Sequence, residues 1–324
     1  MAFRVGIVGL GMAVTPHAKS LADLKVEVAY AFSPSAARRA QFAARFPFPQ
    51  CDRLETILDD RSVNAVLILT PPNTHLELVE KFAAAGKHIL LEKPLEISLD
   101  RAERLVEACS KVKLGIVLQH RFRPGAEKLR EMLPELGRLV SASAAIPNWR
   151  PQSYYDMPGR GTKARDGGGV LLTQGIHTLD LFLSLVGEAA EVKSFVTTSP
   201  VHKMETEDLV AATVKFKNGA IGTVHATTAA YPGFPERIEL IGTKGTALLE
   251  GPSLRIELAD GKKLEVKAEG GGTGADPMAF PHDWHRDLLA DFLAAIENNR
   301  QPRISGEEAL KVHRFIDRIL RSAG

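Results

Sequence analysis

The chain has 324 residues, 44% of them hydrophobic and 25% charged, with 41 lysines and arginines against 39 aspartates and glutamates. This composition is typical of a folded globular protein, and the length allows two domains, each with its own core. The near-neutral charge disfavours nucleic acid or an anionic membrane as a partner, and no segment has the pattern of a membrane span or a signal peptide, so a cytoplasmic protein that binds small molecules is expected.

Short strands alternate with helices in the first third of the chain. Strands are predicted over residues 3–8, 26–32, 64–70, 87–92 and 114–119, with alanine-rich helical segments such as residues 35–46 between them. Such alternation is typical of a doubly wound parallel sheet covered by helices on both faces. An α/β domain of the Rossmann type is therefore expected over residues 1–120.

The pattern changes in residues 121–324, where an α+β domain with a large, mostly antiparallel open sheet is expected. A helix over 124–136 precedes strands predicted over 138–146, 191–198, 209–217, 220–228, 237–242 and 246–250. Asn218-Gly219 favours a two-residue hairpin turn with positive φ at both positions. Two helices are predicted over 283–299 and 306–322, and the glycine-rich stretch Glu269–Met278 has the composition of a mobile loop.

A dinucleotide site is predicted where the first strand meets the first helix. In "VGIVGLGMAV", Gly9 and Gly11 follow the strand, and Met12 and Ala13 lead into a helix whose first amides can hold a pyrophosphate. Val14 stands where the fingerprint has Gly or Ala, and a tight turn without a ligand would give the same pattern.

The end of the second strand favours NADP over NAD. NAD enzymes place an Asp or Glu there for the ribose 2′-hydroxyl, but this chain has Phe32. Ser33 and Ser35 can donate hydrogen bonds to a 2′-phosphate, and Arg38 or its neighbour Arg39 can neutralise it. The alternative is that NAD is the cofactor and that the two arginines lie on the solvated face of a helix.

Several longer motifs resemble the Gfo/Idh/MocA family of NAD(P)-dependent oxidoreductases. They include "TPPNTH", "GKHILLEKPL", "LQHRFRP", "DGGGVLLTQGIHTLD" and "ISGEEALKVHRFIDRI", and they occur in order along nearly the whole chain. The resemblance implies that nicotinamide and a sugar-like substrate meet in a cleft between the two domains. It adds to the cofactor site the residues Thr70, Pro71, Asn73, His75, Glu92, Lys93 and Gln119, with His17 in a supporting role.

Lys93 and His177 are the expected catalytic residues. Lys93 follows an apolar strand, at the edge of a parallel sheet where ligands bind, and its ammonium group can exchange a proton with a reacting hydroxyl. If residues 167–183 form one helix, Thr173, His177 and Asp180 share a face, and Asp180 can orient the imidazole or simply pair with it. Many family members have Asp where this chain has Thr173, so proton transfer is assigned to Lys93 and His177.

The remaining substrate residues are placed by resemblance. They are Arg121, Trp149, Arg150 and Tyr154, joined by Thr173 and His177, with Lys163 as a further cation, and an oligomer contact or an exposed loop explains the region from 149 to 163 equally well. No metal is expected: His282 and His285 have a suitable spacing but no third ligand nearby, and Cys51 and Cys109 are isolated.

The sequence thus predicts an enzyme that prefers NADP and moves a hydride between nicotinamide and a secondary alcohol or ketone of a sugar or sugar derivative. Substrates with a carboxylate, a phosphate or an N-acyl group are favoured over neutral polyols. The alternatives are an NAD-dependent nucleotide-sugar or sugar 3-dehydrogenase and a catalytically silent dinucleotide-binding sensor. By resemblance, the C-terminal sheet joins subunits into a homodimer or homotetramer.

Overall fold

The computed structural model describes residues 3–268 and 281–323, which form two compact units. Of the described residues, the first unit contains 3–117 and 281–310, and the second contains 118–268 and 311–323. The loop expected over Glu269–Met278 lies outside the described residues. Segment 281–310, which follows the large sheet in sequence, thus belongs to the first unit.

The first unit is built on a six-stranded parallel sheet in the order β3-β2-β1-β4-β5-β6. Its strands are β1 (Arg4–Val8), β2 (Glu27–Phe32), β3 (Gln50–Cys51), β4 (Ala65–Ile68), β5 (His88–Glu92) and β6 (Leu114–Val117). Every residue of β4 and β6 is buried, as expected for parallel strands covered on both faces. The strand order is that of a Rossmann fold, and the predicted fold of this part is confirmed.

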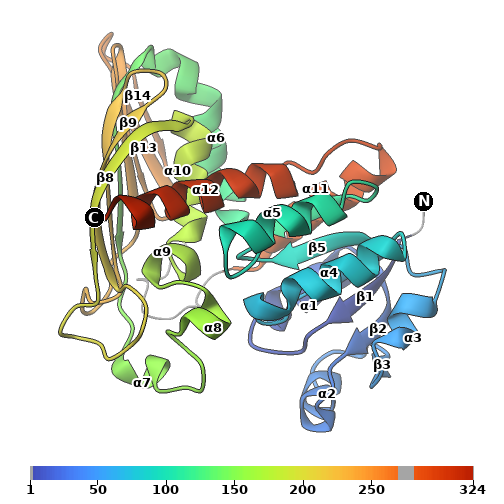
Figure 1. Cartoon of the computed structure of the whole chain (residues 1–324). Coiled ribbons are helices and arrows are strands. Elements are labelled where there is room, and N and C mark those ends of the chain that lie inside the picture. Colours follow the sequence, from blue (N-terminus) through green and yellow to red (C-terminus); the bar gives the residue numbers. More distant parts are fainter. Residues whose placement is uncertain (1–2, 269–280, 324) are drawn as a thin grey trace. The chain divides into compact units, whose positions relative to one another are not determined.

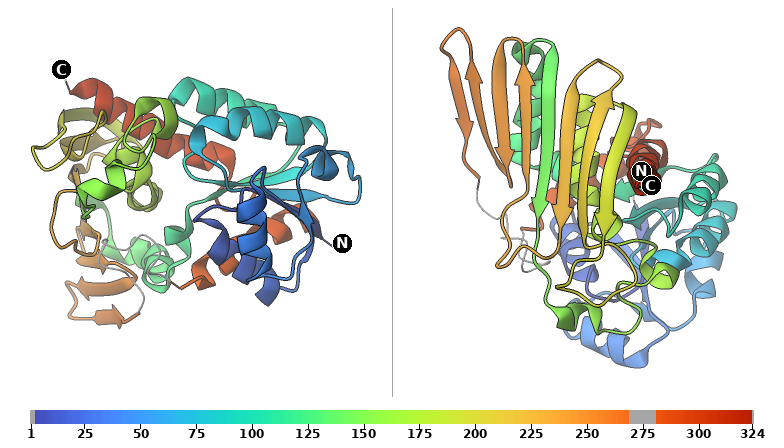
Figure 2. Two further views of the ribbon diagram at one scale, coloured as in Figure 1. Left: turned by 90° about the horizontal axis from the view of Figure 1, so that it is seen from below. Right: turned by 60° about the vertical axis from the view of Figure 1, so that its left-hand side comes forward.

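Helices cover both faces of this sheet. They are α1 (Val14–Asp23), α2 (Ala36–Ala43), α3 (Glu55–Asp59), α4 (His75–Ala84), α5 (Leu99–Ala108) and α11 (Asp283–Glu297), with a 3-10 turn η1 (Pro72–Thr74). Helix α4 packs against α5 on one face and α1 against α11 on the other (Figure 2, left). The strand order reverses on either side of β1, so the loops after β1 and β4 border the crevice where such sheets bind ligands.

The second unit is built on an eight-stranded sheet in the order β14-β13-β12-β11-β7-β10-β9-β8. Neighbouring strands are antiparallel except for the parallel pair β7 and β10, so the sheet is mostly antiparallel, as predicted. The strands are β7 (Leu139–Pro147), β8 (Ala189–Thr197), β9 (Leu209–Phe216), β10 (Ile221–Thr227), β11 (Arg237–Gly242), β12 (Gly245–Glu250), β13 (Ser253–Leu258) and β14 (Lys263–Val266).

One face of the large sheet is covered by helices and the other is open. Figure 1 shows α6 (Pro124–Met132) and α10 (Ile176–Val186) along the covered face. The shorter elements of this unit are η2 (Gln119–Phe122), η3 (Leu133–Leu136), α7 (Gln152–Tyr155), α8 (Lys163–Asp166) and α9 (Val170–Thr173). The last helix, α12 (Gly306–Ser322), is tied to β8 by a hydrogen bond of 2.6 Å from the Ser194 hydroxyl to the Ile319 carbonyl.

The hairpin at Asn218-Gly219 exists, but its turn differs from the prediction. Strands β9 and β10 pair antiparallel, and Phe216 donates to the carbonyl of Ala220, which leaves a three-residue loop. Only Gly219 has a positive φ, of +90°. Asn218 is held instead by its side chain, which donates to the Val186 carbonyl and accepts from the Ala220 amide. The longer loop matches a type I turn followed by a left-handed residue.

The helix conditionally expected over residues 167–183 is interrupted. Helix α9 ends at Thr173 and α10 begins at Ile176, and the Gly175 amide donates back to the Val170 carbonyl at 2.7 Å. A Cβ at Gly175 would lie 3.0 Å from that same carbonyl oxygen, so the tight break favours glycine. Thr173 and His177 therefore lie on different helices.

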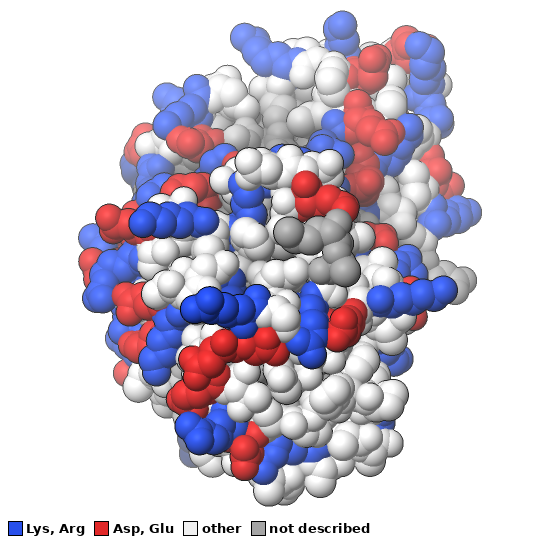
Figure 3. Space-filling view, turned by 90° about the vertical axis from the view of Figure 1, so that its right-hand side faces the viewer, with Lys and Arg blue, Asp and Glu red and all other residues white. Residues whose placement is uncertain are grey.

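The mixed charge of the surface and the lengths of the helices agree with the globular composition of the sequence. Lys and Arg side chains are interspersed with Asp and Glu on the face that Figure 3 shows. Within the described part of the chain, no single helix is both long and apolar enough to cross a membrane. Only the bent pair Lys163–Thr173 and Ile176–Val186 reaches that length and composition together.

Candidate active site

The turn after β1 contains one crowded glycine and one glycine beside open space. Gly9 has a φ of +106°, its amide donates to the Phe32 carbonyl, and a Cβ on it would lie 2.9 Å from the backbone of Leu69. A Cβ on Gly11 would meet no described protein atom within 4 Å. Gly9 is therefore required by the backbone conformation of the turn and by its close contact with Leu69. The open space beside Gly11 fits the close approach of a pyrophosphate to the start of α1.

Met12 and Ala13 complete this turn. Met12 is 55% exposed, and Ala13 is the N-cap residue of α1 without a side-chain hydrogen bond to the helix. The Val14 amide at the start of α1 donates to the Gly11 carbonyl at 3.3 Å, and the position of the turn at a helix N-terminus suits an anionic group.

The loop after β2 is organised by its serines. The Ser33 hydroxyl is buried and accepts from the Ser35 amide, while the Ser35 hydroxyl caps α2 by accepting from the Arg38 amide at 3.3 Å. Arg39 donates to the Ser33 carbonyl at 2.6 Å, whereas the Arg38 side chain is exposed. Because its side chain is exposed, Arg38 is better placed than Arg39 to contact the 2′-phosphate of a bound NADP.

His75 joins the loop after β4 to the loop after β5. Its Nε2 atom lies 2.9 Å from the Thr70 carbonyl, and its Nδ1 atom lies 3.0 Å from the Pro94 carbonyl and 3.1 Å from that of Leu95. The ring is fully buried, and burial lowers its pKa although the surrounding carbonyls act in the opposite direction. His75 therefore fixes the position of the loop that contains Lys93. Pro71 and Asn73 are exposed on the loop after β4.

Glu92 fixes the backbone of Lys93. One carboxylate oxygen accepts from the Lys93 amide at 3.1 Å, and the other lies 2.8 Å from Nε2 of His17. Burial by itself raises the pKa of Glu92, but the hydrogen bond from His17 and nearby positive charge outweigh it, so the pKa is lowered and the group is a carboxylate. Lys93 itself is half-buried at the end of β5.

In the second unit, His177 lies in a stack of two imidazoles. Its ring packs on that of His120, with centroids 4.9 Å apart and ring planes 29° apart. Nε2 of His120 lies 2.7 Å from Arg123, which in turn forms an ion pair with Glu236. The buried Oε1 of Gln119, the residue before His120, has no hydrogen-bond partner within the described chain.

Arg121 and Asp180 form a buried, two-pronged ion pair. The guanidinium donates from Nε at 2.7 Å and from Nη2 at 2.6 Å to the two carboxylate oxygens. The positive charge of Arg121, which we expected to face the substrate, is thus balanced by Asp180. The Thr173 hydroxyl donates to the Gly169 carbonyl at 2.6 Å and also contacts the side chain of Gln174.

Trp149, Arg150 and Tyr154 belong to an aromatic cluster. Residues from other segments of the chain complete this cluster. The Trp149 ring packs edge-on against Tyr231 at 5.4 Å, and Arg150, 5% exposed, lies 5.7 Å above the Tyr154 ring. Arg160 also lies over Tyr154, at 5.0 Å, whereas Lys163 is exposed.

Comparisons with known proteins agree with this architecture. A family model described as the oxidoreductase family, NAD-binding Rossmann fold, matches residues 3–120, and one described as the GFO/IDH/MocA C-terminal domain matches residues 127–248. An uncharacterized protein of Saccharomyces cerevisiae is 30% identical over 84% of this chain and 79% of its own length. The chain belongs to the GFO/IDH/MocA family.

This GFO/IDH/MocA protein is similar to enzymes that act on sugars and polyols. It is 28% identical to the myo-inositol 2-dehydrogenase of Thermotoga maritima, over 94% of this chain and 91% of that enzyme. It shares 25% identity and a TM-score of 0.85 with the WlbA dehydrogenase of Bordetella pertussis, solved in complex with NADH and UDP-GlcNAcA, over 100% of this chain and 97% of that one. The chain is therefore an oxidoreductase with an NAD-binding Rossmann domain.

Two parts of the GFO/IDH/MocA protein's site were not anticipated from its sequence. His120 belongs to the "LQHRFRP" motif, but its contact with His177 joins residues 57 positions apart. His285 lies beside His17 and Glu92, and burial is the main cause that lowers its pKa to about 3. Both histidines can be read from the sequence. Their contacts cannot, because residues so far apart in the chain leave no periodic pattern when they meet.

Proposed function

We propose that the protein interconverts a secondary alcohol and a ketone on a sugar or sugar derivative, with NAD(P) as the hydride carrier. The observation that carries this proposal is the placement of Lys93 at the carboxyl end of β5, with its backbone held by Glu92. Two relatives support the substrate class: the Thermotoga maritima protein is a myo-inositol 2-dehydrogenase, and the WlbA dehydrogenase was solved in complex with UDP-GlcNAcA.

Lys93 is proposed to handle the proton of the reacting hydroxyl. A bound nicotinamide supplies or accepts the hydride, so in oxidation the hydroxyl must also lose a proton and in reduction the carbonyl oxygen must gain one. A lysine ammonium group can donate a hydrogen bond to that oxygen and exchange the proton with it. Glu92 and His75 are positioning residues, because they bind the backbone on either side of Lys93.

His177 is proposed as the second group on the reacting hydroxyl. An imidazole exchanges protons near neutral pH and can hydrogen-bond a sugar hydroxyl in either role. Thr173 cannot replace a carboxylate base, since a hydroxyl of ordinary pKa stays protonated and here it already donates to the Gly169 carbonyl.

NADP is proposed as the preferred cofactor. Phe32 ends β2 in place of a carboxylate, and Arg38 is exposed one helical turn after the serine loop. Each serine hydroxyl accepts a hydrogen bond within the loop and can still donate one, so Ser33 and Ser35 are proposed to bind the 2′-phosphate together with Arg38.

The alternative is an NAD-dependent nucleotide-sugar or sugar 3-dehydrogenase. It is favoured by the similarity to WlbA, which was solved in complex with NADH and UDP-GlcNAcA. Both candidates fit our proposal that substrates with a carboxylate, a phosphate or an N-acyl group are preferred. Because Arg121 is paired with Asp180, Arg150 beside Tyr154 is the buried cation proposed to meet such a group.

The deciding experiment is a panel of neutral polyols, uronic acids and nucleotide sugars, each offered with NADP and with NAD while nicotinamide reduction is followed by absorbance. We expect turnover with NADP and an acidic or nucleotide-linked sugar. Turnover with NAD and a nucleotide sugar alone would favour the alternative, and absence of turnover across the panel in both directions would contradict the proposal.

A homodimer or homotetramer formed through the large sheet remains part of the proposal. The open face of the sheet carries Phe195, Ile221 and Ile241, which are 85%, 65% and 39% exposed in the single chain. Apolar side chains of this size on one face are typical of a protein interface.

A further inference from the structure

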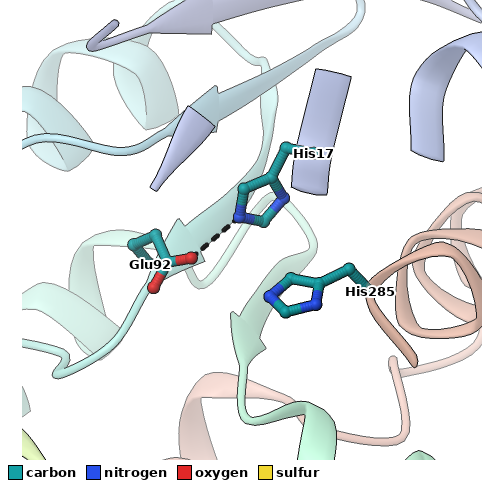
Figure 4. A group of neighbouring side chains, drawn as sticks. All are labelled: His17, Glu92 and His285. Carbon is teal, nitrogen blue, oxygen red and sulfur yellow. Dashed lines mark hydrogen bonds and ion pairs between the residues drawn. The ribbon is translucent and has the colours of Figure 1, made fainter. Parts of the chain in front are cut away.

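Three side chains that could bind a metal ion meet in the first unit. His17 comes from α1, Glu92 from the end of β5 and His285 from the first turn of α11 (Figure 4). The relative exposure is 1% for His17 and 3% for His285, and the Glu92 side chain is 13% exposed. Each offers one ligand atom, and these atoms all lie within 4.8 Å of one another.

The geometry of the three groups is close to that of a ligand set. Nε2 of His17 is 2.8 Å from Oε1 of Glu92, and the His285 ring lies edge-on to the His17 ring, with centroids 5.2 Å apart. Ligands bound at about 2.0–2.2 Å around a tetrahedral Zn²⁺ ion are separated by roughly 3–3.5 Å. Small rotations of the His285 and Glu92 side chains would therefore bring all three atoms onto one ion.

The donor atoms indicate which class of metal would bind. Two imidazole nitrogens and one carboxylate oxygen suit Zn²⁺ and similar transition ions, whereas Mg²⁺ and Ca²⁺ prefer oxygen ligands. The second oxygen of Glu92 accepts from the Lys93 amide, a contact that would orient the carboxylate from outside the ligand shell. Three protein ligands leave a fourth position for water.

We propose that His17, Glu92 and His285 bind one divalent ion of the zinc type. The ion would link three segments that are far apart in sequence, joining α11 to α1, which follows the Gly9–Ala13 turn, and to the end of β5, which precedes Lys93. Its role would be structural, because an ion that binds the folded state and not the unfolded chain stabilises the fold by an amount that grows with the ratio of free ion concentration to its dissociation constant.

His282 provides a matched control on the same helix. It stands three residues before His285 at the N-cap of α11, is 28% exposed and lies 2.8 Å from a carboxylate oxygen of Asp23. Within the described residues the only group of three or more potential ligands is His17, Glu92 and His285, so removal of His282 should leave the site intact.

The test measures metal binding directly on the full-length protein. After treatment with a chelator and desalting, Zn²⁺ is titrated by calorimetry, and Co²⁺ is titrated while its visible absorption is followed. We expect one ion per chain and a higher melting temperature with Zn²⁺ in the wild type and in His282→Ala. In His285→Ala and in His285→Phe, which keeps a ring at the position, we expect the stoichiometric binding to be lost.

Two outcomes would overturn the proposal. The first is a wild type that binds neither ion stoichiometrically, which would leave the cluster as a hydrogen-bonded core. The second is binding that survives in both His285 variants or disappears in His282→Ala, which would place the ion elsewhere. If the His285 variants do not fold, as judged by circular dichroism, anomalous scattering at the zinc edge from wild-type crystals decides: a peak among the three side chains supports the site, and its absence refutes it.

Discussion

The imidazole of His177 stacks on that of His120, with ring centroids 4.9 Å apart. If His177 transfers the proton, His177→Ala should lower kcat by roughly 100-fold or more while dinucleotide affinity stays near the wild-type value. His120→Ala loses both the stack and the contact of Nε2 with Arg123, whereas His120→Phe keeps a ring; the stack is worth about 0.5–1.5 kcal/mol, so kcat should be roughly 2- to 10-fold higher in His120→Phe than in His120→Ala. Steady-state kinetics and pH profiles of the three variants check this, and wild-type turnover in His177→Ala would remove that residue from the reaction.

Lys93→Met should abolish most turnover without loss of the fold. A positioned acid or base contributes roughly 10²- to 10⁴-fold, so kcat should fall by at least that lower amount, while calorimetric NAD(P)H affinity should change little. Lys81→Met, which removes an exposed lysine of α4, serves as the control. Equal kcat in the two variants would contradict the assignment of Lys93.

Arg38→Ala should weaken NADP(H) selectively. A hydrogen bond to a charged group contributes about 1.5–3 kcal/mol, which corresponds to a roughly 10- to 160-fold loss of NADP(H) affinity with little change for NAD(H). Arg53→Ala removes a similar charge from an exposed position of the same unit and should affect neither cofactor. Tighter binding of NAD(H) than of NADP(H) by the wild type would refute the preference.

Asp180→Asn should destabilise the second unit. The ion pair with Arg121 is buried, with side-chain exposures of 9% and 1%, and removal of one partner of such a pair typically costs about 3–5 kcal/mol because it leaves an uncompensated buried charge. Urea unfolding should show the loss, and Glu188→Gln, which breaks the exposed pair with Lys217, should leave the midpoint nearly unchanged. A midpoint equal to that of the wild type would mean that Arg121 finds a replacement partner.

Phe195→Lys combined with Ile221→Glu should dissociate the proposed oligomer. Charges on the open face of the large sheet would oppose burial of that face, so light scattering should give a smaller mass for the double variant than for the wild type. Val201→Lys alters an exposed apolar residue outside the strands and should keep the wild-type mass. A wild type that is already monomeric would disprove this mode of assembly.

The sequence by itself determined the features that depend on local periodicity and turn chemistry. Apolar runs of the length of β4 and β6 predict buried parallel strands, and α12 begins and ends at the residues that its apolar spacing predicts. The β9–β10 hairpin was predictable from Asn218-Gly219, but its turn type was not, since the side-chain hydrogen bond of Asn218 to Val186 depends on a neighbouring segment.

Only the tertiary structure decided which polar side chains share a site. The pairing of Arg121 with Asp180 spans 59 residues, and the meeting of His285 with His17 and Glu92 requires α11 to return to the first unit after the large sheet. Helical spacing likewise suggested that Thr173 and His177 share one face, until the close contact at Gly175 separated α9 from α10. Periodicity records which face of an element is buried, whereas partners in a polar cluster are chosen by long-range packing that leaves no local pattern.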